Sequence, residues 1–107
     1  MHTFKGQNVP GDPLVLGGIA NVTITEGGYF TGAPDNQYAI NEGSRFTSSR
    51  PGSNGGIVVT VVSGVITGIF TINSPGSGYA VNDTITVTRV GATNATKNAT
   101  LTITAIT

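Results

Sequence analysis

The sequence predicts an all-β protein that folds as a single compact β-sandwich or flattened barrel. Runs of alternating apolar and polar residues, rich in β-branched side chains, recur along the chain, and nothing in it has a sustained helical period. Glycine-rich turn sequences separate these runs, as in short antiparallel strands. With 107 residues the chain has room for one domain with one modest core. We therefore expect residues 14–107 to form one β domain, preceded by an extended N-terminal arm over residues 1–13.

The β domain divides into two related three-stranded units, over residues 14–63 and 64–107. Each unit contains a strand, a glycine-tyrosine corner, a second strand, a loop and a third strand. Neither half is large enough to bury a core alone, so we expect the two units to pack together into one sandwich or barrel.

The first unit begins with Ile19 to Thr25, whose alternation is typical of a half-buried strand. Gln37 to Ile40 is a weaker strand. The segment 41–56 is rich in Ser, Gly and Asn, which predicts the longest loop, with Phe46 as its apolar anchor. The nearly continuous β-branched run from Ile57 to Val62 is the third strand.

The second unit begins with a strand over Val65 to Ile72, joined to the preceding run by a two-residue turn at Ser63-Gly64. Thr84 to Thr88 alternates strictly and predicts the next strand. Residues Gly91 to Asn98 are expected to make a polar loop before the last strand, over Ala99 to Thr104.

A glycine-tyrosine corner lies within Ser74 to Asp83 of the second unit, and a fainter copy spans Glu26 to Phe30 of the first. Glycines supply backbone conformations that are closed to other residues, and a tyrosine can bury its ring while its hydroxyl stays wet. We align Tyr29 with Tyr79 and expect the Tyr79 ring to cover the second corner. The residues expected to build the corners are Gly28, Tyr29, Pro75, Gly76, Gly78, Tyr79 and Asp83.

The N-terminal arm contains glycines and prolines that prevent a helix or a central strand. Its sizeable apolar anchors are Phe4, Val9 and Leu14, besides Met1. Such a short segment cannot repay its ordering entropy by folding on itself. We therefore expect these residues to dock the arm on a neighbouring molecule.

Residue types that carry catalysis or bind metals are sparse in this chain. There is no cysteine, and His2 is the one histidine. The five acidic residues show no spacing that identifies a general acid and a general base. Five basic residues balance them, so the net charge of zero gives no electrostatic footprint for nucleic acid or an anionic membrane. We predict no catalytic residue, no cofactor and no metal.

Three patterns leave alternatives open. Asp35 and Asp83 follow the two corners, where they could hold Ca²⁺ or close turns through backbone hydrogen bonds, and we favour the turns. Thr-x-Thr runs could form an ice-binding array, although the β propensity of threonine explains them more simply. Aromatic and arginine side chains could line a sugar-binding surface made of Tyr29, Phe30, Tyr38, Tyr79, Arg45 and Arg50.

The stretch from Gly64 to Tyr79, followed by Asp83 to Val87, resembles repeats in virion proteins of tailed bacteriophages, notably cyanophages. Those repeats consist of a glycine, a short strand, an N-P-G-S-G-Y corner, variable residues and then D-T-[IL]-T-[IV]. The resemblance covers the second unit well and the first unit loosely. In the first unit Glu26 stands in place of the proline-glycine lead-in, and Gly32-Ala33-Pro34 is an insertion.

The resemblance implies a non-enzymatic virion structural protein. A capsid decoration or cement protein that assembles as a homotrimer on the major capsid protein, or on other virion proteins, fits best, because the chain is one short module with a docking arm and without fibre repeats. The alternative is a tail, neck or baseplate accessory subunit that binds a receptor or carbohydrate. The chain start lacks the apolar region of a signal peptide, so synthesis in the host cytoplasm and location in the virion are expected. A surface glycan is a possible further partner, whereas no nucleic acid or membrane partner is expected.

Overall fold

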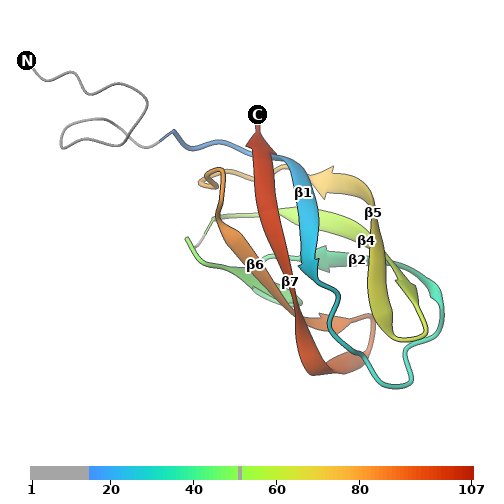
Figure 1. Ribbon diagram of the computed structural model, residues 1–107. Coiled ribbons are helices and arrows are strands. Elements are labelled where there is room, and N and C mark those ends of the chain that lie inside the picture. Colours follow the sequence, from blue (N-terminus) through green and yellow to red (C-terminus); the bar gives the residue numbers. More distant parts are fainter. Residues whose placement is uncertain (1–14, 51) are drawn as a thin grey trace, which may run out of the picture.

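The computed structural model describes residues 15–50 and 52–107 (Figure 1). The predicted arm over residues 1–13 and its expected anchors Phe4, Val9 and Leu14 lie outside the described residues. No helix in the described part of the chain has the length and hydropathy needed to cross a membrane.

Two antiparallel β-sheets form the domain, which confirms the predicted all-β sandwich (Figure 1). One sheet has four strands in the order β1-β7-β6-β3, and the other has three in the order β2-β4-β5. Among the described residues the strands are β1 (Ile19–Glu26), β2 (Asn36–Asn41), β3 (Phe46–Ser48), β4 (Gly56–Val62), β5 (Val65–Ser74), β6 (Thr84–Val90) and β7 (Thr93–Ile106).

Three strands of each sheet are arranged in the same way: the opening strand of one unit, then the closing strand of the other unit, then that unit's middle strand. In the first sheet β1 pairs with β7, which pairs with β6, and in the second β5 pairs with β4, which pairs with β2. Each sequence unit therefore places its opening strand beside the closing strand of the other unit. The short β3 has no counterpart, because it lies within the long loop of the first unit and adds a fourth strand beside β6.

The core lies between the two sheets and is made by alternate residues of their strands. On β4, Ile57, Val59 and Val61 are fully buried, while the residues between them are partly exposed. On the opposite sheet β6 and β7 contribute inward side chains in the same alternation. The largest fully buried side chains are Tyr79, Phe30, Phe46, Ile19, Ile40, Ile57, Ile66, Ile85, Leu101, Ile103, Val59 and Val61.

The β4–β5 hairpin forms where the sequence predicts it. Val62 pairs with Val65, and the two residues between them have positive φ, 53° at Ser63 and 79° at Gly64. This is the backbone of a type I′ turn, whose twist matches that of the flanking strands. Simple alternation fails on β5, because β-bulges shift its register against β4 three times.

The predicted polar loop over Gly91 to Asn98 is wrong. Val90 pairs with Thr93 across a two-residue turn at Gly91-Ala92, and β7 then continues unbroken to Ile106. Its first half consists of Thr, Asn, Ala and Lys, which make no apolar alternation. These residues still form a strand, because β6 supplies backbone partners and Lys97 also bridges to Tyr29.

The long loop over residues 41–56 also contains more order than its composition suggests. Phe46, predicted as its apolar anchor, is fully buried, and it draws β3 onto the edge of β6. Arg50, Ser53 and Gly55 of this loop contact the second corner.

Candidate functional site

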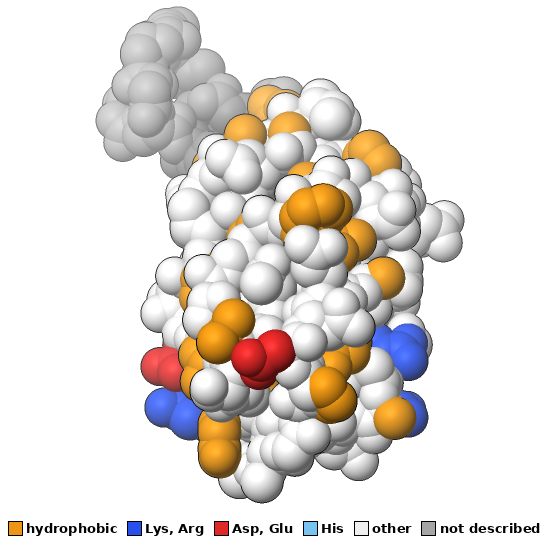
Figure 2. All heavy atoms as spheres, turned by 90° about the vertical axis from the view of Figure 1, so that its right-hand side faces the viewer, with side chains coloured by type: hydrophobic (Ala, Val, Ile, Leu, Met, Phe, Trp, Pro, Cys, Tyr) orange, Lys and Arg blue, Asp and Glu red, His pale blue; other side chains and the backbone are white. Residues whose placement is uncertain are grey.

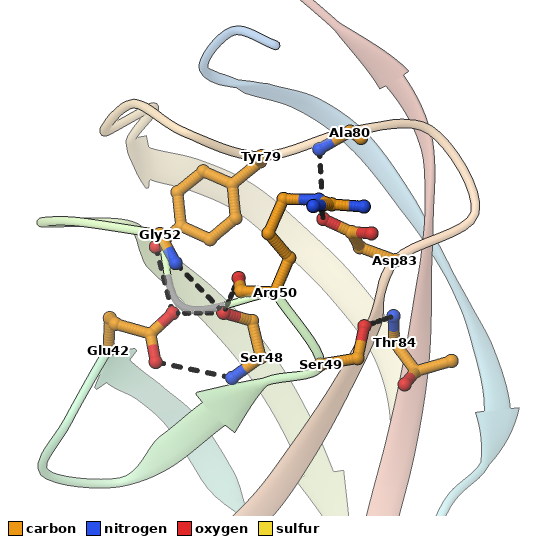
Figure 3. Close-up of polar contacts among 9 residues, drawn as sticks. All are labelled: Glu42, Ser48, Ser49, Arg50, Gly52, Tyr79, Ala80, Asp83 and Thr84. Carbon is orange, nitrogen blue, oxygen red and sulfur yellow. Dashed lines mark hydrogen bonds and ion pairs between the residues drawn. The ribbon is translucent and has the colours of Figure 1, made fainter. Parts of the chain in front are cut away.

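Polar side chains of the long loop meet the second corner in one group, which we call the Tyr79 cluster (Figure 3). Its members are Glu42, Ser48, Arg50, Tyr79 and Asp83. The Tyr79 ring is buried, as the sequence predicts, but its hydroxyl is buried as well, whereas the sequence left it in contact with water. The loop runs directly over its ring, so that a Cβ atom at Gly52 or Gly55 would overlap the ring or the hydroxyl. Only glycine allows this close approach.

The Tyr79 hydroxyl joins the loop to the corner through two hydrogen bonds. It donates to Glu42 Oε1 at 3.0 Å and accepts the Gly55 backbone N–H at 3.0 Å. The Glu42 carboxylate also accepts the Ser48 hydroxyl at 2.7 Å and the Ser48 backbone N–H at 3.2 Å. The Ser48 hydroxyl in turn accepts the Gly52 N–H at 3.2 Å (Figure 3).

The surroundings of the Tyr79 hydroxyl raise its pKa from 10.0 to about 12. Burial is the largest cause, since it disfavours the phenolate, and the hydrogen bond and negative charge of Glu42 act in the same direction. The Gly55 N–H has the opposite effect. Tyr79 therefore remains a protonated donor at neutral pH, which suits a structural bond to a carboxylate and not a general base.

Asp83 fixes the end of the second corner. Its carboxylate, only 7% exposed, accepts the Ala80 backbone N–H at 3.0 Å and lies 3.5 Å from Arg50 Nε. The preceding Asn82 has φ of 76°, in the left-handed region that asparagine tolerates. Asp83 thus closes a turn, the interpretation favoured from the sequence.

Asp35 acts differently from Asp83, although the sequence places the two in equivalent positions. Its Oδ1 accepts the Ser63 backbone N–H at 2.8 Å, so it holds the β4–β5 turn and not its own corner. Among the described residues no group of three or more His, Asp or Glu side chains could hold a metal ion.

Glycines with positive φ bend both corners. Gly28, with φ of 65°, and Gly78, with φ of 82°, precede the aligned tyrosines. A Cβ atom at Gly28 would collide with the β7 backbone, and one at Gly76, also with φ of 65°, would collide with the backbone of the long loop. The first corner links the two sheets through Tyr29 N–H to Lys97 O and Ile66 N–H to Gly27 O, and the second does so through Ile19 N–H to Pro75 O at 2.8 Å.

The sequence alignment of Tyr29 with Tyr79 predicts equivalent side chains, and this is wrong. Tyr29 is 44% exposed and lies over Gly64, whereas the next residue, Phe30, is fully buried. Phe30 N–H donates to the Gly64 carbonyl at 2.7 Å, which directs its ring inward. The first corner is therefore anchored by Phe30, and Tyr29 is a surface residue of it.

The aromatic and arginine residues proposed as a sugar-binding surface do not gather in one place. Tyr79 and Phe30 are buried, and Arg50 pairs with Asp83. Away from the Tyr79 cluster, Tyr38 and Arg45 come together at the β6–β7 turn: the Tyr38 ring lies close to Gly91, and the Arg45 guanidinium donates to the Gly91 carbonyl at 3.1 and 3.0 Å.

The polar groups of the Tyr79 cluster hold the long loop against the second corner. No buried side-chain N or O atom within the described residues lacks a hydrogen-bond partner, and the cluster's polar groups bond to one another or to nearby backbone. Sequence reasoning found Tyr79 and Asp83 but missed Glu42 and Ser48, whose only signal was a loop rich in small and polar residues.

We expect Asp83→Ala to lower the free energy of unfolding by about 2 kcal/mol, because the buried Ala80 N–H loses its acceptor. Arg50→Gln is the matched control. It removes the ion pair but keeps the Ala80 bond, so it should cost less than about 1 kcal/mol, since the Arg50 side chain is 44% exposed and water screens its charge. Urea unfolding measures both. Equal losses in the two variants would show that the ion pair, and not the turn, is the stabilising contact.

The fold and the cluster together define a small antiparallel β-sandwich module whose polar centre holds a loop against a corner. Comparisons with protein-family models, with curated proteins and with solved structures find no match for this chain.

Proposed function

We propose that the chain is a non-enzymatic structural protein of a tailed-bacteriophage virion, and that it decorates and stabilises the capsid as a homotrimer. The observation that carries this proposal is the place of the motif residues in the fold. The residues that resemble virion repeats form β5, the second corner and β6, and their tyrosine is fully buried. A motif that specifies packing suits a repeated structural module better than a reactive site.

The surface supports the same assignment. The strands of the three-stranded sheet, β2, β4 and β5, contain no charged residue. Figure 2 shows the side of the molecule that lies to the right in Figure 1, where hydrophobic side chains are scattered among uncharged polar ones and charged side chains are few. A neutral surface of this kind associates readily with other proteins, as a subunit of a particle must.

The test uses purified virions of the phage that encodes the chain and capsids prepared without it. We expect the added protein to co-sediment with such capsids in a saturable way, and a labelled antibody to mark the heads of intact particles. Label on tails or baseplates would favour the alternative of an accessory subunit. Absence from the particle would contradict both.

The sequence assigns attachment to the N-terminal arm, and a truncation tests that part. Deleting residues 2–12 should weaken co-sedimentation with capsids and leave the melting temperature of the β domain nearly unchanged. Unaltered attachment would refute the docking role. A collapsed melting transition would instead make the arm part of the fold.

A carbohydrate-binding module is the second candidate, and one observation favours it. Tyr38 and Arg45 lie together at the β6–β7 turn, where an aromatic ring beside a guanidinium can contact a sugar. A glycan array distinguishes the candidates. Specific binding that Tyr38→Ala abolishes would support this second function.

A further inference from the structure

Three of the four sheet edges lie against other parts of the domain and are bonded to them in part. The edges of β1 and β5 face each other, and Ile66 N–H donates to Gly27 O at 3.1 Å while Ile19 N–H donates to Pro75 O at 2.8 Å. The outer edge of β3 is bonded by its own turn, through Gly43 N–H to Phe46 O at 2.8 Å. The outer edge of β2 is the remaining one.

The β2 edge lacks the usual protection against pairing. Its sequence, Asn-Gln-Tyr-Ala-Ile-Asn, contains no charge and no proline, and its register against β4 is continuous, without a bulge. Exposed strands normally carry one of these features, because unpaired N–H and C=O groups are templates for another strand. Gln37 and Ala39 are exposed along this edge.

The register identifies which backbone groups point outward. Glu42 N–H donates to Gly55 O at 2.9 Å, in the same register as the β2–β4 pairs. Since hydrogen-bonded pairs alternate along an antiparallel ladder, even-numbered residues of β2 face β4 and odd-numbered residues face outward. The outward residues are therefore Gln37, Ala39 and Asn41.

Two of the outward groups already have partners. Gln37 N–H donates to the Asn36 side chain at 2.8 Å, and Asn41 O accepts the Arg45 N–H at 3.1 Å. No partner within the described residues is found for Gln37 O, Ala39 N–H, Ala39 O or Asn41 N–H. These four groups are placed symmetrically about Ala39.

We propose that the outer edge of β2 binds the same edge of a second copy of this chain. Antiparallel pairing about a two-fold axis at Ala39 joins each Ala39 N–H to the partner's Ala39 O, and each Asn41 N–H to the partner's Gln37 O. The pairing thus uses every free group, and the two groups that it leaves out are those already bonded within one subunit.

The side chains agree with this pairing. Ala39, the residue on the axis, is small, and Asn36 comes to lie opposite the partner's Glu42, so no like charges face each other. The two three-stranded sheets become one continuous six-stranded sheet, in the order β5-β4-β2-β2-β4-β5. The contact is a closed, isologous interface.

We favour a second copy as the partner of this edge because the free backbone groups are arranged symmetrically about Ala39 and so complement themselves. Binding of an unrelated strand would not require that symmetry. One strand pair buries less than the roughly 800 Å² per partner of a stable complex, so the dimer is expected to be weak. The inference is independent of the proposed virion role. A two-fold contact also differs from the homotrimer that the resemblance implies.

Sedimentation velocity of the full chain from about 10 µM to about 1 mM tests the pairing, over the range in which weak dimers dissociate. We expect a mass of two chains at the upper end and of one chain on dilution. Ala39→Lys should abolish the dimer, because it places two ammonium groups side by side across the axis, and high salt should restore it in part. Ala39→Val is the matched control and should still dimerise, because it keeps the backbone groups.

Ala39→Pro provides a second, backbone-level test. It removes the N–H on the axis but breaks no bond to β4, so the melting temperature should change little while the dimer is lost. A single-chain mass for the unaltered protein at about 1 mM, or an oligomer that survives both Ala39→Lys and Ala39→Pro, would overturn the proposal. Co-sedimentation with capsids is scored separately, so a failure here leaves the proposed capsid-binding role untouched, although a mass of one or two chains counts against a homotrimer that forms away from the capsid.

Discussion

Replacing Tyr79 with alanine should lower the free energy of unfolding by about 3 kcal/mol or more, the usual cost of truncating a buried aromatic. The ring is fully buried, and the loop at Gly52 and Gly55 lies directly against it, so the cavity cannot close without moving backbone. Urea unfolding measures the loss. A change below about 0.5 kcal/mol would show that the ring contributes no more than an ordinary surface residue.

Tyr29→Ala is the matched control for this substitution. Tyr29 belongs to the other corner and is 44% exposed, so its removal should cost less than about 1 kcal/mol. A loss at Tyr29 as large as that at Tyr79 would contradict the assignment of the buried anchors. Phe30→Ala, by contrast, should resemble Tyr79→Ala, because Phe30 is the fully buried aromatic of its corner.

Stability should also fall steeply at alkaline pH because of the same hydroxyl. The pKa of Tyr79 is about 12 in the folded protein against 10.0 for an exposed tyrosine. Between these values the unfolded chain loses the proton first, so stability is complete below pH 10 and decreases as the pH rises to 12. Two pKa units correspond to about 3 kcal/mol by pH 12.

Tyr79→Phe isolates this contribution from the other groups that titrate at high pH. The variant should be less stable at neutral pH by about 1–3 kcal/mol, because Gly55 N–H and Glu42 lose a partner. Its further loss between pH 10 and 12 should be smaller than that of the unaltered protein. Parallel stability curves for the two proteins would show that Tyr79 does not titrate late.

The fold was predictable wherever a short stretch contains all the information for its own structure. Ser63-Gly64 between two β-branched runs specifies a tight hairpin, and the hairpin is there. The start of β7 was not predictable, because residues 93 to 98 form a strand only through backbone partners on β6 and at Tyr29. The polar composition of these residues indicates that they are exposed to solvent, but it does not indicate that their backbone pairs with a neighbouring strand.

Only the part of the candidate site that lies within one short stretch of sequence was predictable. Tyr79 and Asp83 belong to one local motif, so the sequence identifies them together. Glu42 reaches Tyr79 from a loop 37 residues away, and only the tertiary fold brings them into contact. Whether Tyr29 or Phe30 turns inward also depends on a distant residue, Gly64, which receives the Phe30 N–H.

The exchange of opening strands between the two units has a consequence for how the chain folds during synthesis. β1 is synthesised before the other strands of the domain, yet among the described residues its ladder partner is β7, with Ile19 paired to Ile106. This half-buried strand therefore stays unpaired until nearly the whole domain has been translated, and such long-range pairing is slow.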